Sequence, residues 1–502
     1  MAPWLWSRTL LQRKDNPPPP LRTRFNILIA DQQTVIFSIF FHFTSFFLSL
    51  PFGLLLQHSF RRKTTAMAAS RQYDLVLLGA TGYTGKLTAE YITTSLPTNI
   101  KWAVAGRSQS KLQSLVTDLK SLNSTRETPD IITTGLTPPE LSTLAKKTKV
   151  LLNTVGPYYL YSTPVVQACA ESGTHYLDVS GETPWIKEII VKFEETATKN
   201  GAIIIPEIGV ESAPSDLVAY KATQLIRKVW DCGVMDCVAA VRELKTSGPS
   251  GGTLASGLGL RAHYSSKEVN EVFNNPFALS PSHLRPYTPY TPKSLYPRSP
   301  EPNTYSRTTI QKLTGVWSYP RLGTLTTSIA AKPNVAIVHR SAGLTPLFYG
   351  FNFTYEEYMA VRSPIIGFLI HVALAILTFL ISIPPIRAIL KATAGYKPGS
   401  GPSKESSKND VLELRAIACA EQLTRSPRKS MAEFRYEGSL YTLSALLLAE
   451  AAVVLLQKDE DVIKKHGAGF LTPSCLGDDY VDRLEKANVK ITVQQIGDVG
   501  SK

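Results

Sequence analysis

A glycine-rich turn near residue 80 is the clearest sign of chemistry in this sequence. The heptapeptide over residues 79–85 follows the apolar run 73–78 and precedes a helix-like stretch over residues 86–95. At such a turn, glycines allow close backbone approach to a pyrophosphate, and the N–H groups at the helix start attract phosphate. The residues predicted to bind a dinucleotide here are Gly79, Thr81, Gly82, Tyr83, Thr84 and Gly85.

An arginine indicates which dinucleotide is bound. A second apolar stretch, residues 101–105, ends in Gly106, Arg107 and Ser108. At this strand tip an acidic residue holds the ribose 2′-hydroxyl of NAD, whereas arginine accepts the 2′-phosphate of NADP. Arg107 has no acidic neighbour, and its planar guanidinium suits a phosphate. We therefore predict NADP(H), held by Arg107 and Ser108. The alternative is a plain turn followed by a solvated arginine.

Candidate catalytic residues follow two later apolar stretches. A reductase needs a bound nicotinamide, a double bond beside it and usually a proton donor. Tyr158 follows the predicted strand 150–155, and Asp178 and Glu182 lie at the end of the predicted strand 174–179. Each is a candidate proton donor, and structural hydrogen bonding is the alternative for each. The residues predicted to line the nicotinamide side are Asn153, Gly156 and Pro157.

The elements that must position these residues alternate between strands and helices. This order predicts a Rossmann-type doubly wound parallel sheet, which binds ligands at the carboxyl ends of its strands. Beyond it we expect a helix over 218–229, a strand over 237–244 and a flexible Gly/Ser loop over 246–259, which open a second α+β domain. The predicted strands of the parallel sheet are 73–78, 101–105, 130–133, 150–155, 174–179 and 202–206.

Composition excludes several classes of protein. The 502 residues include five Cys without CxxC spacing and eight His without an HExxH pattern, so we expect neither a disulfide scaffold nor a metal site. The net charge is +14, from 54 Lys and Arg against 40 Asp and Glu, without a nucleic-acid-binding motif. We therefore assign the positive charge to anionic lipid or a phosphorylated cofactor, and expect no nucleic-acid partner.

The first 66 residues differ from the rest. They hold eight basic and two acidic residues, and residues 34–56 are 23 residues without a charged side chain. As a helix this run would be about 34 Å long, enough to cross a bilayer. Three interpretations stay open: an extension outside a functional protein that begins at Met67, a membrane anchor, and a cleaved secretory signal.

A second apolar run lies at residues 365–383, with 19 residues that carry no formal charge, followed by Pro384 and Pro385. It would be about 29 Å long as a helix. It could span a bilayer, insert into one lipid leaflet or form a core helix. We expect a membrane-associated protein that faces the cytosol, at a lipid droplet or the endoplasmic reticulum. The Pro- and Tyr-rich segment 281–302 is a lid or a surface insertion.

Several motifs together resemble one family. GATGYTG, AGR, NTVGPYYLYSTPVVQAC and HYLDVSGE resemble the saccharopine dehydrogenase-like oxidoreductases, a group that includes the trans-acting enoyl reductases. Residues 209–217 resemble the GFDSxPxDL segment of that family, with Glu211 and Ala213 in place of Asp and Ile. Residues 250–253 resemble its SGGT segment, and residues 438–452 and 471–484 its final helix and tail. The resemblance implies an NADP-type cofactor, a Rossmann domain with an α+β domain, and a link to lipid metabolism.

These observations predict an NADP(H)-dependent oxidoreductase that reduces a C=C or C=O bond of a lipid-like substrate. The alternatives are a saccharopine-type amino-acid dehydrogenase and a non-catalytic lipid-droplet protein that retains a nucleotide fold; a homo-oligomer is left open. The predicted parts are an extension or anchor (1–66), the NADP-binding domain (67–208), the α+β domain (209–360), the apolar helix with its linker (361–400), and a carboxy-terminal helix and tail that complete the fold (401–502).

Overall fold

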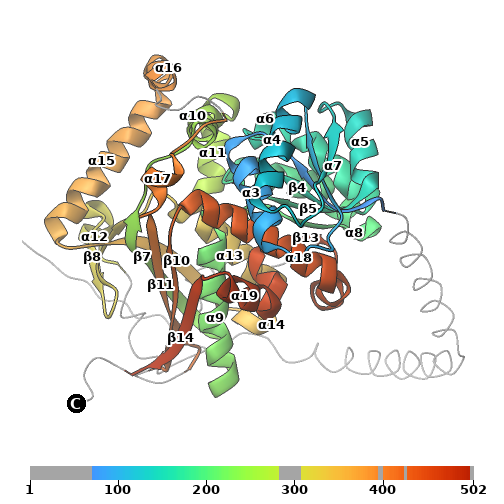
Figure 1. Cartoon of the computed structure of the whole chain (residues 1–502). Coiled ribbons are helices and arrows are strands. Elements are labelled where there is room, and N and C mark those ends of the chain that lie inside the picture. The colour runs from blue at the N-terminus through green and yellow to red at the C-terminus, as the bar shows by residue number, and fades with distance from the viewer. Residues whose placement is uncertain (1–70, 282–306, 394–398, 423–426, 498–502) are drawn as a thin grey trace, which may run out of the picture. The chain divides into compact units, whose positions relative to one another are not determined.

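The structure is a computed structural model that describes residues 71–281, 307–393, 399–422 and 427–497 (Figure 1). The expectations for residues 1–66 and for most of the segment 281–302 therefore concern residues outside the described part. Contacts between Cα atoms group Ser70–Lys502 into one unit. Everything below concerns this unit.

The first sheet has seven parallel strands in the order β13-β6-β5-β4-β1-β2-β3. Six of them overlap the six predicted strands, so the prediction of a Rossmann-type parallel sheet is confirmed. The seventh, β13, comes from the end of the chain and was not predicted. The strands are β1 (Tyr73–Leu78), β2 (Trp102–Gly106), β3 (Asp130–Thr133), β4 (Thr148–Asn153), β5 (His175–Asp178), β6 (Ile203–Ile205) and β13 (Gly469–Phe470).

Helices cover both faces of this sheet because its strands are apolar on both sides. Leu75 and Leu77 of β1 pack on one face, whereas Val76 and Leu78 pack on the other. The first face carries α3 (Tyr83–Ser95), α4 (Gln109–Leu122) and α18 (Leu440–His466), and the second carries α5 (Pro138–Lys147), α7 (Thr163–Ser172) and α8 (Thr183–Asn200). The short helix α6 (Tyr158–Tyr161) follows β4. The doubly wound arrangement therefore encloses two apolar layers.

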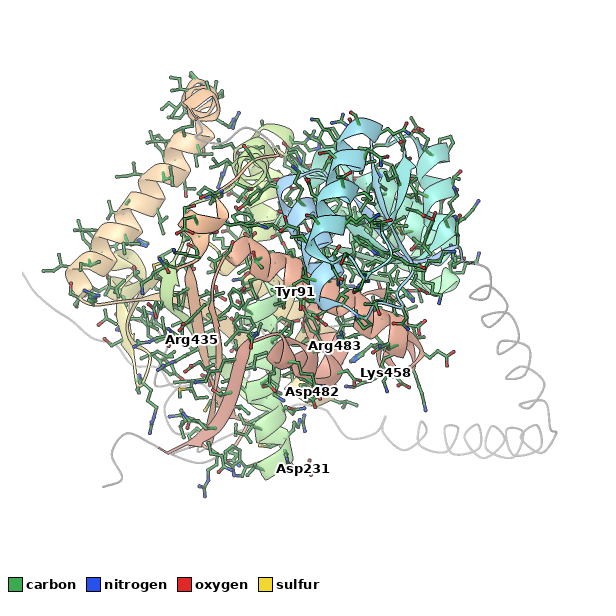
Figure 2. The ribbon with its side chains drawn as sticks, in the orientation of Figure 1. Tyr91, Asp231, Arg435, Lys458, Asp482 and Arg483 are labelled. Carbon is green, nitrogen blue, oxygen red and sulfur yellow. The ribbon has the colours of Figure 1, made fainter. Side chains whose placement is uncertain are left out.

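The long helix α18 is a core element. It has a mean hydropathy of 1.8 over an 18-residue window, yet 78% of that window is buried. It packs against α3, β4 and β5 of the first sheet. Glu450 on this helix accepts hydrogen bonds from the Tyr91 hydroxyl of α3 and from Nε of Arg483, each at 2.6 Å; Figure 2 labels Tyr91 and Arg483. Helix α18 thus joins the last part of the chain to the first sheet.

The second sheet is mixed and runs in the order β14-β12-β11-β7-β10-β9-β8. Only the β7–β10 pair is parallel. Helices α9 (Ala213–Trp230) and α13 (Ala331–Leu344) pack on it. The strands are β7 (Val234–Lys245), β8 (Trp317–Tyr319), β9 (Gly323–Thr327), β10 (Thr354–Val361), β11 (Val411–Ala420), β12 (Lys429–Glu437) and β14 (Lys490–Ile496).

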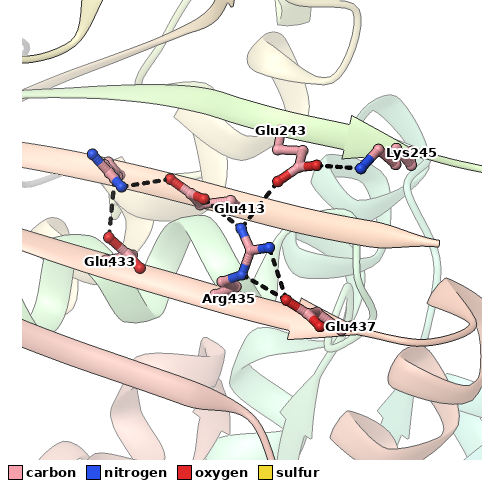
Figure 3. Close-up of polar contacts among 7 residues, drawn as sticks. Glu243, Lys245, Glu413, Glu433, Arg435 and Glu437 are labelled. Atoms are coloured by element: carbon pink, nitrogen blue, oxygen red, sulfur yellow. Dashed lines mark hydrogen bonds and ion pairs between the residues drawn. The ribbon is translucent and has the colours of Figure 1, made fainter. Parts of the chain in front are cut away.

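Charged side chains occupy the opposite face of this sheet from α9 (Figure 3). Arg435 of β12 contacts Glu413 of β11 at 2.5 Å and Glu243 of β7 at 3.0 Å. Arg415 contacts the other oxygen of Glu413 at 2.8 Å. Cross-strand pairs of opposite charge support the register of an antiparallel sheet by about 0.2–1 kcal/mol each. Alternation of apolar and charged residues therefore fixes which face of β11 and β12 covers the core.

The prediction of a flexible loop over residues 246–259 is wrong from residue 251 onward. Residues Gly251–His263 form helix α10, in which the Ser250 hydroxyl caps the start by accepting from the Thr253 N–H at 3.3 Å. Tertiary packing overrides the low helix propensity of its glycines, since α10 lies against α15 and α16. The remaining helices are α11 (Ser266–Phe273), α12 (Thr309–Thr314), α14 (Pro346–Tyr349), α17 (Lys404–Ser407), a 3₁₀ turn (Pro473–Leu476) and α19 (Gly477–Lys486).

Helix α15 (Pro364–Ser382) is apolar and exposed. It has a mean hydropathy of 2.6, and only 6% of its apolar window is buried. Its first two turns are held to β9, where the Thr326 hydroxyl donates to the Gly367 carbonyl at 2.7 Å. The helix ends before Pro384 as predicted, and α16 (Pro384–Thr393) follows (Figure 1). Such exposure does not fit the core-helix alternative.

Candidate active site

The turn after β1 is shaped so that only glycine fits at two positions. Gly79 has a φ of +82°, and a Cβ there would lie 2.8 Å from Cγ2 of Val155. A Cβ on Gly85 would collide with the Gly79 carbonyl oxygen. Thr154, at the end of β4, lies against both glycines and donates to the Leu78 carbonyl at 2.9 Å. The two glycines therefore let the turn pack closely against the residues after β4, which is the tight turn and close packing that a dinucleotide-binding turn needs.

Helix α3 begins in this turn, at Tyr83. Gly82 is its N-cap and supplies no side-chain oxygen to the first N–H groups, which have no partner within the helix. Thr81 and Thr84 are half-buried beside them. Tyr83 instead turns toward the chain around residue 402, because its hydroxyl donates to the Pro402 carbonyl at 2.6 Å. The helix start therefore fits a phosphate group.

Arg107 stands at the end of β2 with an exposed guanidinium. It makes no hydrogen bond or ion pair with any residue that the structure describes. Ser108 caps α4 by accepting from the Lys111 N–H at 3.4 Å, and its hydroxyl lies 3.2 Å from that of Ser110. Sequence reasoning missed Lys111, a cation in the first turn of α4, where the helix dipole disfavours positive charge. An anion bound beside Arg107 and Lys111 would relieve that cost.

The end of β4 is held by Asn153. Its amide donates to the Ser162 hydroxyl at 2.8 Å and the Tyr176 hydroxyl at 3.0 Å, and its oxygen accepts from the Val155 N–H at 3.0 Å. The residue is fully buried, so these bonds orient the loop that follows. Gly156 in that loop is exposed, and Pro157 begins the turn into α6. Of the three residues predicted to line the nicotinamide side, Asn153 is buried and holds the loop that contains the other two, Gly156 and Pro157.

The three predicted proton donors are hydrogen-bonded within the protein. Both Glu182 oxygens accept backbone N–H groups, from Tyr158 at 3.0 Å and Tyr159 at 2.7 Å. The Tyr158 hydroxyl is directed at the Asn153 carbonyl at 3.3 Å. Burial raises the pKa of the Tyr158 hydroxyl and of the Glu182 carboxyl. These contacts favour positioning roles, and the catalytic roles stay predictions.

Asp178 has the most complete set of partners. One oxygen accepts from the Ser180 N–H, the Ser180 hydroxyl and the Glu207 N–H at 2.9, 2.6 and 3.0 Å, and the other accepts from the Tyr176 hydroxyl at 2.8 Å. Burial raises the pKa of this carboxyl, whereas the hydrogen bonds lower it. Asp178 therefore links the ends of β5 and β6 at the carboxyl edge of the sheet.

Two further carboxyl groups stand at this edge. Glu211 follows β6, and its Oε2 lies so close to Gly181 that a Cβ there would overlap it. Its side chain is exposed and makes no hydrogen bond or ion pair with the described residues. Glu207 is fully buried, and its Oε1 has no hydrogen-bond partner among the described residues. The sequence marked Glu211 only as a departure from a family motif. It did not indicate a site residue, because the neighbours of Glu211 come from distant segments of the chain.

The site thus combines a tight glycine turn, a helix start and an arginine that has no partner in the described part of the chain, a set that fits NADP. Among the described residues no cluster of three His, Cys, Asp or Glu side chains could hold a metal ion.

Comparisons with known proteins agree with this geometry. A family model described as the saccharopine dehydrogenase NADP binding domain matches residues 75–205. A trans-acting enoyl reductase of Mycobacterium ulcerans is 29% identical over 450 residues, which cover 86% of this chain and 99% of the relative. A Mycobacterium tuberculosis protein whose name also describes a trans-acting enoyl reductase is 30% identical over 441 residues, with the same coverage. The chain belongs to the trans-acting enoyl reductase family.

Membership in this family, together with the matched NADP-binding domain, makes the protein an NADP(H)-dependent oxidoreductase. The prediction of NADP(H) as cofactor is confirmed. Among solved structures, the apo saccharopine dehydrogenase (L-Glu forming) of Saccharomyces cerevisiae aligns with a TM-score of 0.48 at 12% identity, over 85% of this chain and 100% of that one.

Proposed function

We propose that the protein uses NADPH to reduce a C=C or C=O bond of a lipid-like substrate at a membrane or lipid-droplet surface. The observation that carries the lipid part of this proposal is α15, an apolar helix whose side chains are exposed along most of its length. Large exposed apolar surfaces mark sites of contact with membranes or partners. Ile310 and Leu313 of α12 add two more exposed apolar side chains.

Helix α10 connects this apolar surface to the cofactor site. The Ser256 side chain of α10 lies near enough to Glu182 to lower the pKa of that carboxyl, and a Cβ on Gly156 would lie 3.9 Å from the Ser256 hydroxyl. Near the other end of α10, the Arg261 carbonyl accepts from Arg387 of α16 at 3.2 Å. A substrate with its apolar chain in the lipid and its reactive bond near Gly156 would therefore lie along α10.

The proposed roles of the chain in cofactor binding follow from the geometry. The backbone of residues 79–85 holds the pyrophosphate, and Arg107, Ser108 and Lys111 hold the 2′-phosphate. Gly156 and Pro157 line the nicotinamide side. When bound, the cofactor supplies the hydride, and the protein positions the substrate and excludes water.

The ionisable groups at the carboxyl edge of the first sheet favour the lipid reductase over the amino-acid dehydrogenase. A substrate with several carboxylates needs Arg or Lys side chains to bind them. The edge instead carries the carboxyl groups of Asp178, Glu182, Glu207 and Glu211. Carboxyl groups supply no positive charge to bind an acidic substrate, and as hydrogen-bonding groups they suit an uncharged reactive group.

Incubation of purified protein with NADPH and a lipid extract tests the proposal against a non-catalytic lipid-droplet protein. We expect the absorbance of NADPH to fall only when the extract is present. Bound NADPH that is never oxidised across a broad extract would favour the non-catalytic alternative. A rate with saccharopine but not with lipid would favour the amino-acid dehydrogenase.

A further inference from the structure

We propose that Glu211 is the catalytic acid of this site and donates the proton that completes reduction of the substrate double bond. The proposal rests on the proposed function. It assigns a role to a residue outside the three predicted proton donors, and it begins from the position of that residue at the carboxyl edge of the first sheet.

Glu211 is accessible to solvent and lies near the cofactor site. It lies in the turn between β6 and α9, and its carboxyl group contacts Gly181 in the loop that follows β5. Ligands of doubly wound sheets bind outside the carboxyl ends of the strands, where both loops lie. Unlike Asp178 and Glu182, Glu211 has no protein partner among the described residues and reaches solvent. Its carboxyl group is therefore free to contact a substrate.

The groups that face Glu211 come from three elements, and all of them are acidic. Glu182 lies after β5, Glu357 lies on β10 of the second sheet, and Glu207 lies at the end of β6. Glu357 is buried and accepts from the Ser215 hydroxyl at 2.6 Å and from Asn334 at 2.7 Å. These contacts fix the carboxyl group of Glu357 in place, and burial raises its pKa. Whenever Glu357 is ionised, its negative charge opposes ionisation of Glu211.

Glu207 is the second observation that points to a site. It is fully buried, its Oε2 accepts from the Ser212 hydroxyl at 3.3 Å, and its Oε1 has no partner within the part of the chain that the structure describes. Its backbone φ of +57° is a conformation that L-residues rarely adopt. Burial, followed by the charge of Glu211, raises the pKa of the Glu207 carboxyl well above its usual value.

The same surroundings keep a proton on Glu211 near neutral pH. Burial of the carboxyl group, followed by the charges of Glu182 and Glu357, raises the pKa of Glu211 to about 7. The Glu211 side chain reaches solvent, so its carboxyl group can lose a proton to a substrate and recover one from water. A general acid is most effective when its pKa lies near the working pH.

The proposed step balances as follows. The substrate double bond is reduced by two electrons: one carbon accepts the hydride that bound NADPH supplies, leaving NADP⁺. The other atom of the bond accepts the proton from Glu211, whose O–H bond breaks as the new bond forms. The resulting Glu211 carboxylate is then protonated from solvent.

Glu211→Gln tests this role, with trans-2-hexadecenoyl-coenzyme A as the enoyl probe. The matched control is Glu127→Gln, the same change at an exposed glutamate that is distant from Glu211 in the sequence. We expect kcat to fall roughly 100-fold or more in Glu211→Gln, in the range typical of a lost general acid, with the Kd for NADPH unchanged. Glu211→Asp, which keeps a carboxyl group, should recover part of the rate. An equal kcat in Glu211→Gln and Glu127→Gln overturns the proposal.

An infrared pH titration without cofactor gives a second readout. The wild type and Glu127→Gln should show a protonated-carboxyl band that titrates near pH 7, and Glu211→Gln should lack it. If that band persists in Glu211→Gln, Glu211 is not the group that holds the proton, and the proposal fails while the proposed function stands. A wild type that binds NADPH but oxidises it with neither the probe nor a lipid extract contradicts the proposed function itself, and the role of Glu211 with it.

Discussion

Arg107 and Lys111 are two cations within five residues at the start of α4, and Arg107 has no partner among the described residues. Arginine at the end of the second strand matches the 2′-phosphate that distinguishes NADP from NAD. Because a guanidinium binds phosphate by charge-assisted hydrogen bonds, this position should control cofactor choice.

We expect Arg107→Ala to weaken NADPH binding by roughly 10- to 100-fold, since hydrogen bonds to charged groups contribute about 1.5–3 kcal/mol. NADH binding should be unchanged, because NADH lacks the 2′-phosphate. Titration of both cofactors by fluorescence measures the two affinities. Lys120→Ala, at the far end of α4, is the control. Equal affinities for NADPH and NADH in the wild type would remove the role assigned to Arg107.

Gly85 offers a test of the turn itself. A Cβ at this position would overlap the Gly79 carbonyl oxygen, so Gly85→Ala must displace the backbone of the turn. Overpacking of this kind costs about 1–3 kcal/mol, and we expect NADPH affinity to fall roughly tenfold or more. Gly497→Ala is the matched control, because its Cβ would meet no atom within 4 Å. Unchanged affinity in Gly85→Ala would mean that no pyrophosphate contacts this turn.

The pH dependence of the reaction should follow Glu211. Its raised pKa of about 7 means that the acid form dominates below that pH. The rate should therefore be constant at low pH and fall about tenfold per pH unit above it. Glu211→Gln should abolish this limb of the pH profile of kcat. A limb that is unchanged in Glu211→Gln would identify another titrating group.

The local arrangement of the predicted cofactor residues follows from the sequence more directly than that of the predicted proton donors, for a physical reason. The glycine turn and Arg107 are local, because a strand, a turn and a helix in order fix their positions. Tyr158, Asp178 and Glu182 looked available, but their partners are backbone groups and hydroxyls that only the fold brings together. The distinctive surroundings of Glu211 depend on Glu357, which is 146 positions further along the chain.

Among the elements, α18 depends on one buried carboxylate. Glu450→Ala leaves the Tyr91 hydroxyl and the Arg483 guanidinium without their partner. Loss of one member of a buried charge pair costs about 3–5 kcal/mol; because Arg483 is partly exposed, we expect a loss at the lower end, about 3 kcal/mol. Urea denaturation measures it. Glu460→Ala, at an exposed position on the same helix, should change stability little; similar losses in both variants would contradict the assigned role of Glu450.

Helix α15 should bind lipid. Replacement of Leu369, Ile376 and Phe379, all exposed, with serine removes apolar surface that would otherwise be buried in a bilayer. Burial of one such side chain contributes about 1.5–3 kcal/mol, so we expect vesicle binding to fall at least roughly tenfold. Co-sedimentation with phosphatidylcholine vesicles measures it. Val191→Ser, at an exposed apolar position on α8, is the control. A wild type that stays in the supernatant would argue against membrane association.

The strands of the first sheet were predictable because buried parallel strands are continuous apolar runs. Helix α10 was not, because its sequence is rich in glycine and serine and only its contacts with α15 and α16 favour a helix. Strand β13 has two residues, too few for a sequence pattern, and its pairing with β6 exists only once the chain has folded.

At the scale of the whole molecule, the end of the chain completes both sheets. Helix α18 covers one face of the first sheet and β13 pairs with β6, while β11, β12 and β14 make up nearly half of the second sheet. The segment that the family model matches, residues 75–205, therefore does not have a complete core of its own.

A chain of residues 67–438 should consequently fail to bind NADPH, because it lacks α18 and β13. A chain of residues 67–502 should bind NADPH as the full chain does. Thermal unfolding and NADPH fluorescence measure both. NADPH binding by the shorter chain would show that the first sheet does not need the helix that covers it.

Hydride transfer to a lipid is the central claim, and isotope labelling tests it most directly. The protein would be incubated with NADPH carrying deuterium at the transferable C4 position and with a lipid extract, and the products analysed by mass spectrometry. We predict a lipid product that gains one deuterium per molecule, with a second hydrogen that comes from solvent. Deuterium found only in a polar amino acid, or in no product although NADPH is bound, would contradict the account.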